Sequence, residues 1–106
     1  MLAEMKCTPI DKAKPPMPLT EAKKMLSEIL GWTLVNSTIT REFKFKNFIE
    51  AMQFVNKVAD LANSEDHHPD IHISYSKVRL ELSTHAIGGL SMNDFIVAAK
   101  INLFKP

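Results

Sequence analysis

Two runs of alternating apolar and polar residues, only two residues apart, most constrain what this 106-residue chain can fold into. Residues 71–76 alternate in this way, and so do residues 78–85. Alternation with a period of two predicts strands that have one buried face and one polar face. Because only Ser76-Lys77 separates the two runs, we expect the strands to pair as an antiparallel hairpin.

Three helices are predicted from spacing and capping. The first spans 20–30, with Thr20 as its N-cap, and Gly31 ends it. The second spans 47–63 and opens on a capping-box pattern in which asparagine is the cap. Its apolar residues recur at helical spacing, in a stripe wide enough to cover a sheet. The third runs from Ser91 to about residue 104 and opens on a similar pattern.

A second strand pair, 32–35 and 38–45 around the polar turn Asn36-Ser37, completes the set. The order of elements predicts an α+β fold with two layers, a four-stranded antiparallel sheet with three helices packed on one face. Residues 1–18 hold four of the six prolines and show no periodicity, so we expect a flexible N-terminal arm. Residues 19–106 are then a single domain.

Charge and hydropathy exclude several classes of protein. The formal net charge is +1, with 13 basic and 12 acidic residues mixed along the chain, so the basic stripe of a nucleic-acid-binding protein is missing. Nowhere do about 18 apolar residues run together, so we expect no transmembrane helix. No secretory signal is visible, and the single cysteine, Cys7, fits a reducing compartment. These features predict a cytoplasmic protein with no nucleic-acid or membrane partner.

The third predicted helix is apolar around most of its circumference. Such a helix is buried on both sides. A domain of this size is expected to cover one side only, so the sequence predicts that a second copy of the chain covers the other. This argument favours a homo-oligomer and does not separate a dimer from a tetramer.

Two adjacent histidines, His67 and His68, lie between carboxylates in the segment Glu65–Asp70. Pro69 disfavours helical geometry at His68, so the pair is placed on the loop that leaves the second helix. Imidazole exchanges protons near neutrality because its unperturbed pKa is about 6.5. A third histidine, His85, ends the predicted hairpin. The simplest interpretation is that all of these are solvated loop residues.

A metal site is the second interpretation, since several histidines with nearby carboxylates bind zinc or iron. Neighbouring histidines rarely reach the same ion, and no HExxH spacing or cysteine cluster accompanies them. The prediction is therefore that the chain holds no metal.

General acid–base catalysis without a metal is the third interpretation. It requires titratable groups from different elements to meet in one pocket. His67, His68 and His85 stand at two loop ends, and Asp94 opens the last helix; Asp94 can equally well only close a capping box. Trp32 could form an aromatic wall for a flat ligand or could simply pack in the core. Cys7 lies in the predicted flexible arm, so we do not expect it to act as a covalent nucleophile.

Several sequence motifs together resemble those of a known family. The resemblance covers about residues 20–104 and rests on Gly31-Trp32, Phe43-Lys44-Phe45-Lys46-Asn47-Phe48, Asp66-His67-His68-Pro69, Tyr75-Ser76-Lys77-Val78, Leu82-Ser83-Thr84-His85, and Gly89-Leu90-Ser91 with Asp94. Together, in this order, these motifs resemble the signature of the pterin-4a-carbinolamine dehydratases.

The resemblance implies an activity. Family members dehydrate 4a-hydroxytetrahydrobiopterin to quinonoid dihydropterin and water, need no cofactor, recycle the pterin of aromatic amino-acid hydroxylases, and form dimers or tetramers. The implied catalytic residues are His67, His68 and His85, with Asp94 in support. The implied substrate-binding residues are Trp32, Asp66, Pro69, Ser83 and Thr84.

The resemblance implies that His67 and His85 act as acids that protonate the 4a-hydroxyl. It implies that His68 binds the pterin ring and assists transfer of the proton at N5. Two positions depart from the pattern. Asn63 stands where some relatives have a carboxylate, and Ile71 where some have a tryptophan.

The alternative function is that of a non-catalytic interaction module, because animal relatives also act as a dimerisation cofactor of a homeodomain transcription factor.

Overall fold

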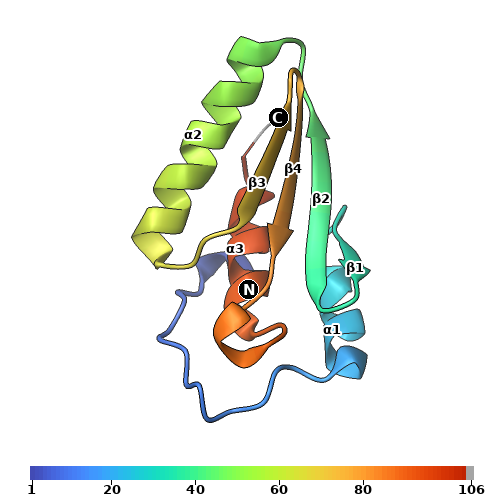
Figure 1. The fold of residues 1–106 in the computed structure, drawn as a ribbon, viewed down its shortest axis with the longest axis vertical. Coiled ribbons are helices and arrows are strands. Elements are labelled where there is room, and N and C mark those ends of the chain that lie inside the picture. Colours follow the sequence, from blue (N-terminus) through green and yellow to red (C-terminus); the bar gives the residue numbers. More distant parts are fainter. Residues whose placement is uncertain (105–106) are drawn as a thin grey trace.

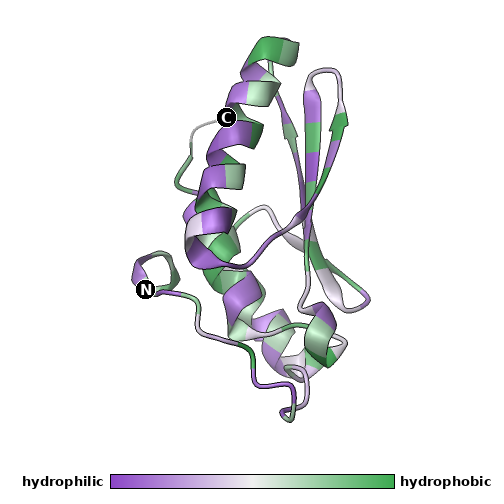
Figure 2. Ribbon diagram, turned by 60° about the vertical axis from the view of Figure 1, so that its left-hand side comes forward, coloured by the Kyte–Doolittle hydropathy of each residue, from purple (hydrophilic) through white to green (hydrophobic). Residues whose placement is uncertain are grey.

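The computed structural model describes residues 1–104, so residues 105–106 of the predicted 19–106 domain lie outside it. Four strands form one antiparallel sheet in the order β1-β2-β4-β3, and helices cover one face of it (Figures 1 and 2). The elements are η1 (Leu2–Glu4), α1 (Leu19–Met25), η2 (Leu26–Glu28), β1 (Thr33–Val35), β2 (Thr38–Lys44), α2 (Phe48–Glu65), β3 (Asp70–Ser74), β4 (Lys77–Leu82), η3 (His85–Ile87) and α3 (Met92–Ile101). The α+β fold class predicted from the sequence is confirmed.

The β3–β4 hairpin turns one residue earlier than the alternation predicts. Ser74 pairs with Lys77, so Tyr75 and Ser76 form the turn in place of Ser76-Lys77. Tyr75 adopts a φ of 51°, the left-handed conformation that a tight two-residue turn requires. The β1–β2 turn lies at Asn36-Ser37 as predicted, and Asn36 has a φ of 55°.

The core lies between the sheet and helices α2 and α3. The inner face of the sheet contributes fully or almost fully buried side chains, namely Ile39, Phe43, Val78, Leu80 and Leu82. The predicted apolar stripe of α2 meets them through Ala51, Val55, Val58 and Ala62, whereas Phe48 of that stripe is half exposed. Phe54, which the stripe did not include, is buried as well. Phe54 stacks at a tilt on Phe43, with ring centroids 4.6 Å apart.

The two ends of α2 follow local chemistry. At its start the side chain of Asn47 accepts a hydrogen bond of 2.9 Å from the Glu50 N–H, as the capping pattern predicts. At its end Asp66 takes a left-handed φ of 52° and turns the chain out of the helix. The helix therefore stops immediately before His67, which places the histidine pair on a loop.

The first and last helices differ at their ends from the prediction. Pro18 occupies the N-cap position of α1 in place of Thr20, and the helix tightens into η2 after Met25. The last helix, α3, ends at Ile101. Within residues 1–104, none of the helices has both the length and the apolarity needed to cross a membrane.

The N-terminal segment lies against the domain, which differs from the expected flexible arm. Leu2 is buried, and Lys100 Nζ on α3 donates to the Ala3 carbonyl at 2.9 Å. Figure 1 shows the segment, in blue, running from beside α3 beneath η3 to α1. Prolines without periodicity predict an absence of helix and strand, and they do not exclude packing.

This docked segment changes the argument about α3. Residues 93–99 and Ile101 are all buried within a single chain, because η1 covers the side of α3 that the sheet and α2 leave open. The all-round apolar surface of α3 is therefore satisfied without a second copy. Assembly into a homo-oligomer stays a prediction that rests on the family resemblance.

Candidate active site

His67 and Asp94 form the centre of the candidate site. The Nε2 atom of His67 lies 2.6 Å from Oδ1 of Asp94, and both side chains are buried, His67 being 8% and Asp94 0% exposed. The left-handed turn at Asp66 directs the chain so that His67, just past the end of α2, reaches the first turn of α3. The two elements are thereby joined by a charge-assisted contact.

The second carboxylate oxygen of Asp94 is held from two directions. Oδ2 accepts from the Thr84 hydroxyl at 2.8 Å and from the Ser91 N–H at 2.9 Å. The Ser91 and Thr84 hydroxyls are 2.7 Å apart. Since the Thr84 hydrogen goes to Asp94, Ser91 donates to Thr84. The Thr84 hydroxyl and the Ser91 N–H both donate a hydrogen to Oδ2, so this oxygen acts as an acceptor.

This arrangement determines the tautomer of His67. An ionised carboxylate oxygen can only accept, so Nε2 of His67 carries the hydrogen. Nδ1 is then the nitrogen that can exchange a proton with a substrate. A carboxylate that accepts a hydrogen bond from one ring nitrogen of a histidine fixes the orientation of the ring.

His85 follows Thr84 directly in the chain. It is the first residue of η3, and its side chain is exposed. The loop that carries it is closed by backbone bonds between Thr84 and Gly89, the shorter one 2.7 Å long. Neighbouring Cα atoms are about 3.8 Å apart, so the backbone of His85 lies next to the Asp94 network. The structure therefore brings His85 to the same end of the sheet as His67.

His68 is exposed and bonds to the helix it has just left. Its Nε2 lies 3.0 Å from Oδ1 of Asn63 on α2. Asn63 is the position at which the sequence departs from the carboxylate of some relatives. A neutral amide orients the ring without adding a negative charge beside it. His67 and His68 are adjacent in sequence and yet have partners of different charge.

The remaining predicted residues divide into two groups. Asp66, Pro69 and Ser83 flank the histidines on the segments 66–69 and 83–85. Trp32 lies elsewhere: it is buried, its Nε1 donates to Asn102 at 2.8 Å, and its ring packs edge-on against Phe43. Asn102 follows α3, eight residues after Asp94, which corresponds to about 12 Å along a helix. The structure thus does not bring Trp32 to the histidines.

Two polar residues of this region were not assigned a site role from the sequence. Ser91 was predicted only as a helix cap, and no sequence signal indicates its contact with the Thr84 hydroxyl. Asn93, 4% exposed, binds the backbone of Thr8 in the N-terminal segment. The sequence shows only that Asn93 precedes Asp94 in the first turn of the predicted helix, and its contact with Thr8 depends on tertiary packing.

Two other chemical groups are not members of this centre. Burial, followed by the nearby charge of Glu65, raises the pKa of the Cys7 thiol to about 12. A thiol with that pKa is protonated at neutral pH, so Cys7 does not supply a nucleophile. His72 faces the outer side of the sheet and pairs with Glu81 at 3.2 Å. Within residues 1–104, no three histidine, cysteine or carboxylate side chains converge as a metal ligand set.

The fold and these contacts define a class of site. A small α+β domain holds a carboxylate-oriented histidine beside two further histidines at one end of its sheet, and such a set is equipped to give and take protons.

Comparison with known proteins specifies the class. Residues 15–104 match the family model described as pterin 4 alpha carbinolamine dehydratase. A protein of Nitrosospira multiformis, provisionally named a pterin-4-alpha-carbinolamine dehydratase, is 48% identical over 101 residues, which are 95% of this chain and 89% of that protein. One of Sulfolobus acidocaldarius with the same provisional name is 49% identical over 82 residues, 77% of this chain and 90% of its own length.

A solved structure agrees with these matches. The transcriptional coactivator/pterin dehydratase of Brucella melitensis superposes with a TM-score of 0.78 at 35% identity, over 82% of this chain and 95% of that one. The chain belongs to the pterin-4a-carbinolamine dehydratase family, whose members are hydro-lyases.

Proposed function

We propose that the protein dehydrates a 4a-hydroxytetrahydropterin to the quinonoid dihydropterin by histidine acid–base catalysis. The observation that carries this proposal is the 2.6 Å contact between the buried His67 and Asp94 side chains, next to the loop that bears His85. Family membership supports the substrate class. We assign the reaction to residues 19–106 as one domain.

The reaction needs two proton transfers. An acid protonates the 4a-hydroxyl, the C4a–O bond breaks with its electron pair leaving on water, and a base removes the proton from N5. The nitrogen electrons then form the C4a=N5 double bond, so the products are quinonoid dihydropterin and one water. One proton is given and one is taken, and the residues return to their starting states by exchange with solvent.

His67 has the best environment for the acid. With Nε2–H directed at Asp94, the ring is held in one orientation, and Nδ1 is the nitrogen that remains to pass a proton to the departing hydroxyl. His68, whose partner is the neutral amide of Asn63, is assigned as the base at N5. His85 is exposed on the neighbouring loop, and we assign it as a second acid.

The alternative is a non-catalytic interaction module. The observation that favours it is that the similar Brucella melitensis protein is described as a transcriptional coactivator as well as a pterin dehydratase. Binding a protein partner through a helix or strand face does not require a buried histidine paired with a carboxylate. The intact network of His67, Asp94 and Thr84 therefore supports catalysis over a purely structural role.

The test is a direct assay with carbinolamine generated chemically. The proposal predicts that catalytic amounts of protein accelerate dehydration well above the spontaneous rate. A rate equal to that of buffer, with a correctly folded protein, would leave the interaction module as the better account. Homo-oligomer formation, a cytoplasmic location and a functional link to an aromatic amino-acid hydroxylase are further proposals that rest on the family.

A further inference from the structure

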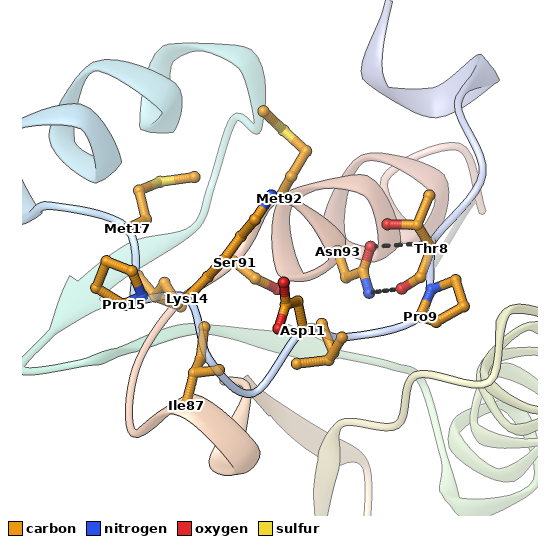
Figure 3. A pocket seen from close by; sticks show the side chains of 12 residues that line it. Thr8, Pro9, Asp11, Lys14, Pro15, Met17, Ile87, Ser91, Met92 and Asn93 are labelled. Atoms are coloured by element: carbon orange, nitrogen blue, oxygen red, sulfur yellow. Dashed lines mark hydrogen bonds between the residues drawn. The ribbon is translucent and has the colours of Figure 1, made fainter.

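Two consecutive residues of the N-terminal segment bind two different helices. The Cys7 N–H donates to Oε1 of Glu65, in the last turn of α2, at 2.8 Å. The Thr8 N–H donates to Oδ1 of Asn93, in the first turn of α3, at 3.1 Å, and the Asn93 amide returns a bond of 2.7 Å to the Thr8 carbonyl. Figure 3 shows this reciprocal pair.

The two partners stand immediately beside the catalytic pair. Glu65 precedes His67 by two residues, and Asn93 precedes Asp94 by one. The segment therefore joins the same two helix ends that the His67–Asp94 contact joins. A shift of α2 relative to α3 that lengthened the His67–Asp94 contact would also stretch the bonds to Cys7 and Thr8.

We propose that Cys7 and Thr8 form a clip that positions His67 against Asp94. Its kinetic consequence rests on the proposed function, whereas its effect on the His67–Asp94 geometry does not. Glu65 and Asn93 are then positioning residues, since they act on the reaction through the histidine–carboxylate pair. The family model matches only residues 15–104, so the clip lies outside the part of the chain that defines the family.

The N-terminal segment is held to the domain on both sides of the clip, so the clip contacts can be removed without releasing the segment. Cavities of about 500 and 280 Å³ lie beside it, the smaller one shown in Figure 3. The segment is anchored independently at both ends, by Leu2 in the core and by the Met17 N–H bond of 2.7 Å to the Leu90 carbonyl. Removing the clip contacts should therefore leave the segment and the domain folded.

The test uses side chains on the helices and a control on the segment. The double variant Glu65→Ala/Asn93→Ala removes the three hydrogen bonds that the Glu65 and Asn93 side chains make to the backbone of Cys7 and Thr8. Thr8→Ala is the control, because the clip uses only the backbone of Thr8. Glu65→Gln is a rescue variant that keeps an oxygen to accept from the Cys7 N–H.

The expected result has a kinetic and a spectroscopic part. In the double variant kcat falls about ten- to a hundredfold, as small misplacements of reacting groups do, with KM changed less than about twofold. The unaltered protein should show a downfield proton NMR signal from His67 Nε2–H, and in the double variant this signal should broaden or disappear. Thr8→Ala and Glu65→Gln keep both properties.

Unchanged kcat and an unchanged His67 signal in the folded double variant would overturn the clip. A loss of activity that Glu65→Gln shares with Glu65→Ala would overturn it too. If the unaltered protein shows no dehydration, the proposed function fails, and the NMR signal still decides whether the clip positions His67.

Discussion

His67 Nε2 lies 2.6 Å from Asp94 Oδ1 across 27 residues of sequence, and the contact fastens the end of α2 to the start of α3. Both groups are buried, and the other oxygen of Asp94 is already occupied by Thr84 and Ser91. Oδ1 is the oxygen left to accept from His67. In the proposed mechanism, proton transfer depends on the same atom pair that links the two helices.

Asp94→Asn should lower both stability and activity. An amide offers one acceptor oxygen in place of two, so at least one donor among His67, Thr84 and Ser91 faces an NH₂ group. A buried donor left without a partner costs about 1–3 kcal/mol of unfolding free energy. Urea denaturation measures this loss. Asp60→Asn, at an exposed position of α2, is the matched control and should unfold like the unaltered protein.

His85→Ala should lower kcat about a hundredfold, the usual size of one lost proton transfer, without changing stability. The side chain is exposed and begins η3, so its removal leaves the backbone bonds between Thr84 and Gly89 in place. His72→Ala is the control, since His72 lies on the outer face of the sheet, paired with Glu81. Equal turnover of the two variants would remove His85 from the catalytic set.

Cys7 should react slowly with thiol reagents in the native protein. Burial raises its thiol pKa from an ordinary 9.0 to about 12. At about pH 8 the thiolate fraction, and with it the rate of labelling by a disulfide reagent, is about a thousandfold lower than for an unperturbed thiol. Protein unfolded in guanidinium provides the comparison. Labelling of the native protein at the unfolded rate would show that the N-terminal segment is not docked as described.

Glu65 should make docking of the N-terminal segment sensitive to acid. The hydrogen bond from the Cys7 N–H holds the pKa of the Glu65 carboxyl below its usual 4.5. A group whose pKa is lower in the folded state stabilises it above the unfolded value and loses that contribution as the pH falls. The unfolding free energies of the unaltered protein and of Glu65→Gln should therefore differ at about pH 6 and converge towards about pH 3. A difference that stays constant over this range would contradict the pairing.

Periodicity and capping predicted most of the architecture. Alternation at residues 71–76 and 78–85 identified the hairpin, and Pro69 correctly ended α2 before the histidines. The turn was misplaced by one residue because Tyr75 continues the apolar alternation while adopting the left-handed backbone of a turn. Nothing in the residue type signals that conformation, since tyrosine rarely adopts it.

Contacts between distant segments were the part that sequence could not supply. The spacing of His67 and Asp94 gives no distance between them, and the link through Thr84 and Ser91 depends on tertiary packing. Residues 1–18 were expected to be free because prolines interrupt any periodic pattern, yet their backbone groups bond to Glu65 and Asn93. Trp32 was equally compatible with a pocket wall and with the core, and packing against Phe43 and Asn102 places it in the core.

The most direct test of the central claim compares initial rates of carbinolamine dehydration for the unaltered protein and for His67→Ala. The reaction can be followed by the ultraviolet absorbance of the quinonoid product, with circular dichroism used to verify the fold of both proteins. We predict that the unaltered protein accelerates dehydration and that His67→Ala loses about a hundredfold in kcat. Equal rates for the two folded proteins would contradict the assignment of His67 as the acid oriented by Asp94.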